Sequence, residues 1–248
     1  MSNTRQENSV FMVGATGRRH IPEQALPALE RTTREILATL ESCRASEVCV
    51  CTGMAIGVDS MIARLVLEAR EERPDSKLRL CAISPMALQA YEEDFSTSKL
   101  VFSGQTELEQ FQELWSRADQ RLCLRHTQEP LDRVAQYESL GLYLITHCDL
   151  LLAYWSGSTS TVKRGGSVDV ALQMSRRLGG GTVVAVATPE LLRLREPSGE
   201  CRLETEKLRE GVATGDLATL QEPWQGDVDF GDKNEAFNLL RASCTEFF

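Results

Sequence analysis

Short apolar runs alternate with stretches of helical periodicity through the first 190 residues of the chain. The apolar runs, which are expected to be strands, are residues 9–13, 47–52, 78–83, 121–124, 149–155 and 182–187. Apolar side chains recur every three or four residues from about residue 23, from about residue 59, and within 106–119, 129–147 and 168–178. This spacing indicates helices. The alternation predicts an α/β fold, a Rossmann-like and mainly parallel sheet flanked by helices on both faces.

The pattern changes after residue 190, where charged residues and then Pro, Gly and Asp dominate. We therefore expect residues 9–190 to form one α/β domain. Residues 191–248 are expected to be a charged extension that ends in a short helix over 234–248. That helix either packs on the core or leads to a partner or an effector.

Three of the predicted strands lead directly into segments that contain paired glycines. The glycines of these segments are Gly14 and Gly17, Gly53 and Gly57, and Gly165 and Gly166. The first amides of a helix lack intrahelical partners and favour negative charge, and glycine lets a backbone approach a ligand closely. Because the carboxyl ends of parallel strands share one edge, the three segments are expected to converge on one anion-binding crevice.

Several side chains in and beside these segments are suited to a nucleotide. Guanidinium groups bind phosphate well, but a solvated surface role is the alternative for each basic residue. Trp155 could stack on a base or belong to the core. The candidate ligand-binding residues are Gly14, Thr16, Gly17, Arg18, Arg19, Gly53, Met54, Ala55, Asp59, Glu138, Trp155, Lys163, Arg164, Gly165, Gly166, Ser167 and Asp169.

The acidic candidates have two interpretations each. Asp59 and Asp169 lie near helix starts, where a carboxylate can cap free amides or contact a ligand. Glu138 is either on the exposed face of its helix or in the site. In an enzyme, Glu138 or Asp169 would be the catalytic residue, acting as a general acid or base.

Composition narrows the class of protein. The net charge of −9 argues against a general binder of nucleic acid or anionic membranes, and no apolar stretch is long enough to span a bilayer. The first nine residues lack the apolar centre of a signal peptide. The eight cysteines contain no CxxC pair, so neither a zinc site nor a disulfide framework is indicated. We expect a reduced, cytoplasmic protein with no metal and no cofactor beyond its nucleotide-derived ligand.

Taken together, three segments resemble the SLOG superfamily, the Rossmann-like domains of the DNA-processing (SMF/DprA) and Lonely-Guy-like groups. They are Val13 to Arg18, Thr52 to Asp59, and Asp149 to Gly157 with Arg164 to Asp169. The similarity spans about residues 9–190 and implies a nucleotide-type ligand over the carboxyl ends of the strands. Some members cleave the base from a nucleoside monophosphate with the glutamate of a PGGxGTxxE signature. The matching segment here contains no glutamate, and its acid is Asp169.

The resemblance therefore favours a sensor over an enzyme. Other members bind signalling nucleotides, such as cyclic ADP-ribose relatives or cyclic oligonucleotides, in bacterial antiviral systems. We expect a sensor of such a second messenger that works as a homo-oligomer or through an effector, without a nucleic-acid or membrane partner. The alternative is a nucleotide N-glycosidase. A single-stranded DNA binder is the third possibility, and the net charge of −9 argues against it.

Overall fold

The computed structural model describes residues 10–43, 45–101, 103–124, 132–155, 165–175 and 182–187. Their strands form one parallel sheet of six strands in the order β4-β3-β2-β1-β5-β6. The strands are β1 (Val10–Gly17), β2 (Glu47–Thr52), β3 (Leu78–Ser84), β4 (Gln120–Cys123), β5 (Leu150–Trp155) and β6 (Thr182–Ala187). The chain moves outward from β1 on one side and then returns to place β5 on the other. The topological switch point therefore lies between β1 and β5.

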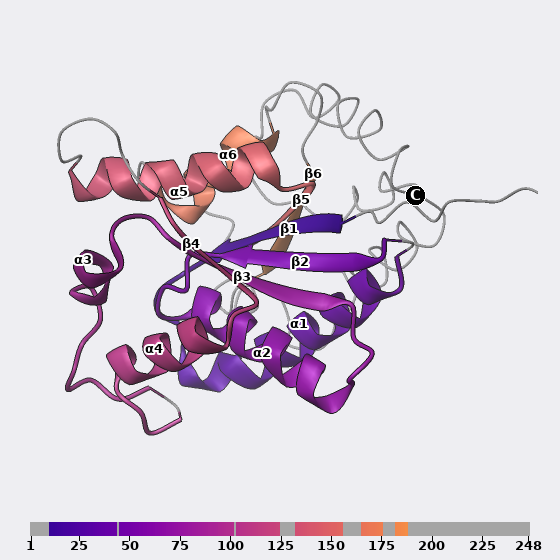
Figure 1. Ribbon diagram of the computed structural model, residues 1–248, viewed down its shortest axis with the longest axis horizontal. Helices are drawn as coiled ribbons and strands as arrows, with labels where there is room; N and C mark the ends of the chain where they lie inside the picture. Colours follow the sequence, from indigo (N-terminus) through magenta and orange to yellow (C-terminus); the bar gives the residue numbers. More distant parts are fainter. Residues whose placement is uncertain are drawn as a thin grey trace, which may run out of the picture.

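Helices cover both faces of the sheet, as the sequence predicted. Helices α1 (Leu26–Glu41), α2 (Val58–Glu72) and α4 (Glu107–Arg117) lie on one face, and α5 (Arg133–His147) and α6 (Ser167–Ser175) lie on the other (Figure 1). Each face buries its own apolar core. The Rossmann-like α/β fold is confirmed.

The core under α5 and α6 contains four cysteines. Cys49 and Cys51 on β2, Cys81 on β3, and Cys148 before β5 are all at most 3% exposed. Side chains alternate between the two faces of a strand, so residues two apart on β2 share this face. None of these four cysteines forms a disulfide, and no group of His, Cys, Asp or Glu within the described ranges is arranged to hold a metal ion.

The first glycine segment is not a loop. Residues 14–17 are the second half of β1, and they pair with Leu151 to Tyr154 of β5. Glycine is required there by close packing: a Cβ on Gly17 would lie 2.5 Å from a methyl carbon of Val58, and one on Gly14 would lie 3.0 Å from Leu151. Glycine is a usual sign of a turn, but here it lets neighbouring side chains reach the central strand.

Most predicted helices are present with small shifts at their ends. The helix expected from residue 23 starts as a 3-10 turn, η1 (Glu23–Ala25), before α1. Helix α4 begins at a capping box in which Thr106 and Glu109 exchange hydrogen bonds. The short helix α3 (Leu88–Glu92) was not predicted.

The proposed extension, residues 191–248, lies outside the described residues, so its organisation and terminal helix stay predictions. No helix in the described part of the chain is both long and apolar enough to cross a membrane.

Candidate functional site

The ends of β1 and β2 are locked together at the carboxyl edge of the sheet. The α2 start at Val58 donates its N–H to the carbonyl of Arg18 over 3.0 Å. Gly57 has a φ of +101°, and a Cβ there would lie 2.4 Å from the same Arg18 oxygen. The amide at the start of α2 was expected to face an anion, but it donates its hydrogen bond to a carbonyl of the chain itself.

Asp59 completes this first junction from inside. Its side chain is 7% exposed, and its carboxylate accepts the N–H of Gly17 over 3.1 Å. Burial raises the pKa of Asp59 to about 7, although hydrogen bonds from Gly17, Thr52 and Gly53 lower it. The carboxylate thus ties the ends of β1 and β2 together, a structural role that differs from the helix capping considered above, and its contact with a ligand stays a prediction.

A second junction connects the end of β1 to the start of α6. The Ser167 hydroxyl donates to the carbonyl oxygen of Gly17 over 2.9 Å and accepts from the Thr16 hydroxyl over 3.0 Å. These residues are 150 positions apart in the sequence. The first and third glycine segments therefore meet at the switch point between β1 and β5, as expected.

Gly165 and the predicted acids lie around the α6 start. Gly165 has a φ of +70°, and a Cβ there would lie 3.0 Å from the backbone nitrogen of Glu138. Asp169 accepts the N–H of Gly165 over 2.8 Å, so its carboxylate stabilises the turn into α6. The structure brings Glu138, Gly165 and Asp169 together from two helices and the preceding turn.

Other predicted site residues are less accessible to a ligand or lie outside the residues that the structure describes. The Met54 side chain is 0% exposed, so only its backbone, which has a φ of 61°, can reach a ligand. Trp155 ends β5 and pairs with Ala187 through its backbone. Lys163 and Arg164 lie outside the described residues.

Arg19 crosses the carboxyl edge of the sheet toward α5. Its Nη2 donates to the Tyr137 hydroxyl over 2.8 Å, and its guanidinium lies 5.2 Å from the centre of the Tyr137 ring. The same hydroxyl donates to Asp94. Nearby, the Tyr91 hydroxyl donates to the carbonyl of Gly53 over 2.5 Å. Neither tyrosine was predicted to be a site residue, because their partners come from distant segments of the chain.

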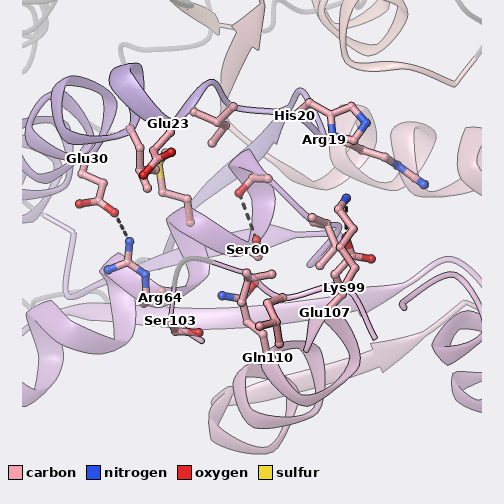
Figure 2. Close-up of a pocket in the computed structure, with 17 residues that line it drawn as sticks. Arg19, His20, Glu23, Glu30, Ser60, Arg64, Lys99, Ser103, Glu107 and Gln110 are labelled. Atoms are coloured by element: carbon pink, nitrogen blue, oxygen red, sulfur yellow. Dashed lines mark hydrogen bonds and ion pairs between the residues drawn. The ribbon is translucent and has the colours of Figure 1, made fainter. Parts of the chain in front are cut away.

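Two adjoining cavities open at this edge, beside the first junction. The larger, of about 600 Å³, lies between η1, the start of α2 and the segment that leads into α4 (Figure 2). The smaller, of about 180 Å³, is lined by Tyr91, Phe95, Tyr137 and Ala55 among others. Of the predicted site residues, Arg19 lines both cavities and Ala55 lines the smaller, while Gly57 of the second glycine segment lines the larger. Lys99 and Glu107 line both, and no motif in the sequence indicated them.

Comparison with known proteins identifies structural neighbours only. The sequence matches no family model and no curated protein. DNA processing protein A (DprA) from Streptococcus pneumoniae aligns with 71% of this chain at 13% identity and a TM-score of 0.46. The chain covers 50% of the length of that protein. DprA from Helicobacter pylori aligns with 96% of this chain and 84% of its own length, at 14% identity and a TM-score of 0.42.

One expectation is contradicted by this comparison. The net charge suggested that the chain has no nucleic-acid partner, but the Helicobacter pylori neighbour is described by its mode of binding single-stranded DNA. Net charge is a sum over the whole chain, and it does not report a local basic surface. The structural neighbours are DprA proteins, the group named in the SLOG resemblance, and they share the Rossmann-like fold.

Proposed function

We propose that this chain binds a phosphate group of a nucleotide-type ligand between β1 and the start of α6. In this proposal it is a sensor that responds to a nucleotide-derived signal. The expected response is a change in self-assembly or in an effector, as in the antiviral systems that the SLOG resemblance suggests. A cytoplasmic location and a homo-oligomeric state are further parts of the same proposal.

One observation carries the proposal: hydroxyl groups, rather than a buried carboxylate, close the β1–α6 junction. Ser167 connects Thr16 and Gly17 to the first turn of α6. Hydroxyl groups can donate to phosphate oxygens as well as to a carbonyl, and the amides of a first helical turn favour an anion. The junction also lies at the switch point, where sheets of this type bind ligands.

Binding without cleavage is favoured by the position of the acids. Asp169 already accepts the Gly165 amide, which is a capping role. A general acid or base must reach the proton that it transfers in a plausible pose of the substrate. An Asp169 carboxylate that is bonded to its own turn is poorly suited to that task, so a glycosidase remains the less favoured alternative.

Calorimetry with AMP, ADP-ribose and cyclic di-AMP tests the proposal, with a short oligo-dT included because it offers the same phosphate chemistry. We expect at least one probe to bind the wild-type chain. The Ser167→Ala variant should bind that probe about tenfold more weakly, equivalent to roughly 1.4 kcal/mol. The matched control is Ser139→Ala, because Ser139 bonds only the Ala135 carbonyl of its own helix.

The same samples separate the alternatives. Chromatography of the mixtures after incubation should show no free base, and light scattering should show a ligand-dependent change in mass. Release of adenine would favour the glycosidase. Failure of every probe to bind would refute the proposal.

A further inference from the structure

We propose that the junction between the two cavities is a second anion subsite, so that the ligand carries two phosphate groups. This inference rests on the proposed function, because the first phosphate is the one bound between β1 and α6. It identifies the class of ligand more narrowly, as a nucleotide with phosphates at two positions.

The junction is defined by the residues that line both cavities. These are Arg19, His20, Ile56, Lys99 and Glu107. Three of the five are basic and one is acidic, in a chain whose net charge is −9. Figure 2 shows Arg19 and His20 on one side of the larger cavity and Lys99 opposite them. The basic groups thus come from two separate segments and face a shared space.

An ion pair with Glu107 holds Lys99 in position. Its Nζ lies 2.8 Å from Glu107, while 57% of the Lys99 side chain is exposed. Burial raises the pKa of Glu107, but the bonds from Lys99 and from the Ser96 N–H outweigh it and hold that pKa below its usual range. An ammonium group has three donors, so an ion pair with Glu107 leaves donors for a ligand.

Arg19 is also held in position, by Tyr137 of α5. One of its five N–H donors goes to Tyr137, and the Tyr137 ring lies beside its guanidinium. Groups that are already held in place lose less conformational entropy when an anion binds. Both fixed cations are therefore prepared for a phosphate.

The remaining acids near the cavities compete little with this subsite. Asp94 accepts the Tyr137 hydroxyl and lies 3.5 Å from Arg133. Glu30 is paired with Arg64, and with Glu23 it lies at the far end of the larger cavity (Figure 2).

The two subsites are neighbours along the chain. Gly17 belongs to the β1–α6 junction, and Arg19, which lines both cavities, follows two residues later. Two extended residues span roughly 7 Å of backbone at most. We therefore expect a single nucleotide with phosphates on two hydroxyls to reach both subsites, whereas AMP can occupy one subsite only.

Calorimetry with AMP and with adenosine 3′,5′-bisphosphate tests this inference. The bisphosphate should bind wild-type protein about tenfold more tightly than AMP, the effect of roughly 1.4 kcal/mol from the second anion. Lys99→Met should abolish that preference and leave AMP affinity unchanged. His20→Ala should reduce it without removing the Lys99–Glu107 ion pair, which covers the case in which Lys99→Met fails to fold.

Lys77→Met is the control, because Lys77 bonds the Cys43 carbonyl far from the cavities and should keep the full preference. Equal affinity of the wild-type protein for the two probes would overturn the second subsite and leave the proposed function standing. An equal loss for both probes in Lys99→Met and His20→Ala would overturn it as well. Binding of neither probe would overturn the second subsite, and the proposed function would fall with it only if ADP-ribose, cyclic di-AMP and oligo-dT also failed to bind.

Discussion

The carboxyl edge of the sheet has two junctions with the same sequence pattern, a strand, glycines and a helix start, but they are closed differently. At the β1–β2 junction, a buried carboxylate and a backbone carbonyl fill the space, through Asp59 and Arg18. At the β1–α6 junction, two hydroxyl groups connect the segments, through Thr16 and Ser167. In the first arrangement the Gly17 and Val58 amides already bond to groups of the chain itself, whereas hydroxyl groups can exchange one partner for another. Glycine after a strand therefore predicts close approach, and the neighbouring groups decide whether a ligand or the protein itself makes that approach.

The largest effect should come from breaking the β1–β2 junction with Gly57→Ala. A Cβ would clash with the Arg18 carbonyl and the residue would keep a φ near +101°, so we expect a loss of more than about 3 kcal/mol of unfolding free energy. Urea denaturation measures this loss of unfolding free energy. Gly104→Ala is the control: Gly104 has a φ of +82° but no atom within 4 Å of the added Cβ. It should lose about 1–2 kcal/mol. Equal losses would mean that the close approach at Gly57 contributes nothing.

The pH dependence of stability tests Asp59 at the same junction. Its folded-state pKa of about 7 lies above the usual value for an aspartic acid, so folding favours the protonated acid. This contribution is fully present below the unfolded-state pKa and is lost as pH rises through the folded-state pKa. We expect the stability of wild type relative to Asp59→Asn to fall by on the order of 2 kcal/mol between about pH 5 and about pH 8.

Urea denaturation of both proteins at the two pH values gives this difference, in which the other titrating groups cancel. A relative stability that stays constant between the two pH values would show that Asp59 is ionised throughout. Its hydrogen bonds from Gly17, Thr52 and Gly53 would then outweigh its burial.

The smallest effect on stability should come from the β1–α6 junction. Ser167→Ala removes two hydrogen bonds that involve neutral groups, so we expect a loss of about 1 kcal/mol in urea denaturation. Ser139→Ala, which removes one hydrogen bond within α5, should lose less. If Ser167→Ala were as damaging as Gly57→Ala, the contrast between the two junctions would be wrong.

The sequence predicted the sheet well because its strands are short apolar runs, and β2 and β3 are buried along nearly their whole length. Residues 47–52 and 182–187 are apolar runs with clear boundaries, and they are strands with those same limits. Residues 14–17 were misassigned as a loop, since the need for glycine there arises from Val58, Leu151 and Cys148. Those neighbours are set by the tertiary fold and leave no periodic signal.

The candidate site was predicted only in part for a related reason. The meeting of Gly17 with Ser167 followed from strand order, because parallel strands end at one edge. Lys99, Glu107 and Tyr137 could not be foreseen, because each acts through a partner from another segment. The short helix α3 and the segment before α4 have no apolar periodicity that would place them beside the glycine segments.

The four cysteines under α5 and α6 have a consequence for how opening of this layer can be followed. Thiol–thiol hydrogen bonds shift the pKa of Cys49 and Cys81 in both directions, and burial adds to the net rise to about 12. The thiolate is the form that attacks alkylating reagents, so these thiols are inert while the layer is closed. Among the cysteines in the described residues, Cys123, which is only partly buried, should react first. Alkylation of Cys49, Cys51, Cys81 and Cys148 themselves then reports how often α5 and α6 separate from the sheet.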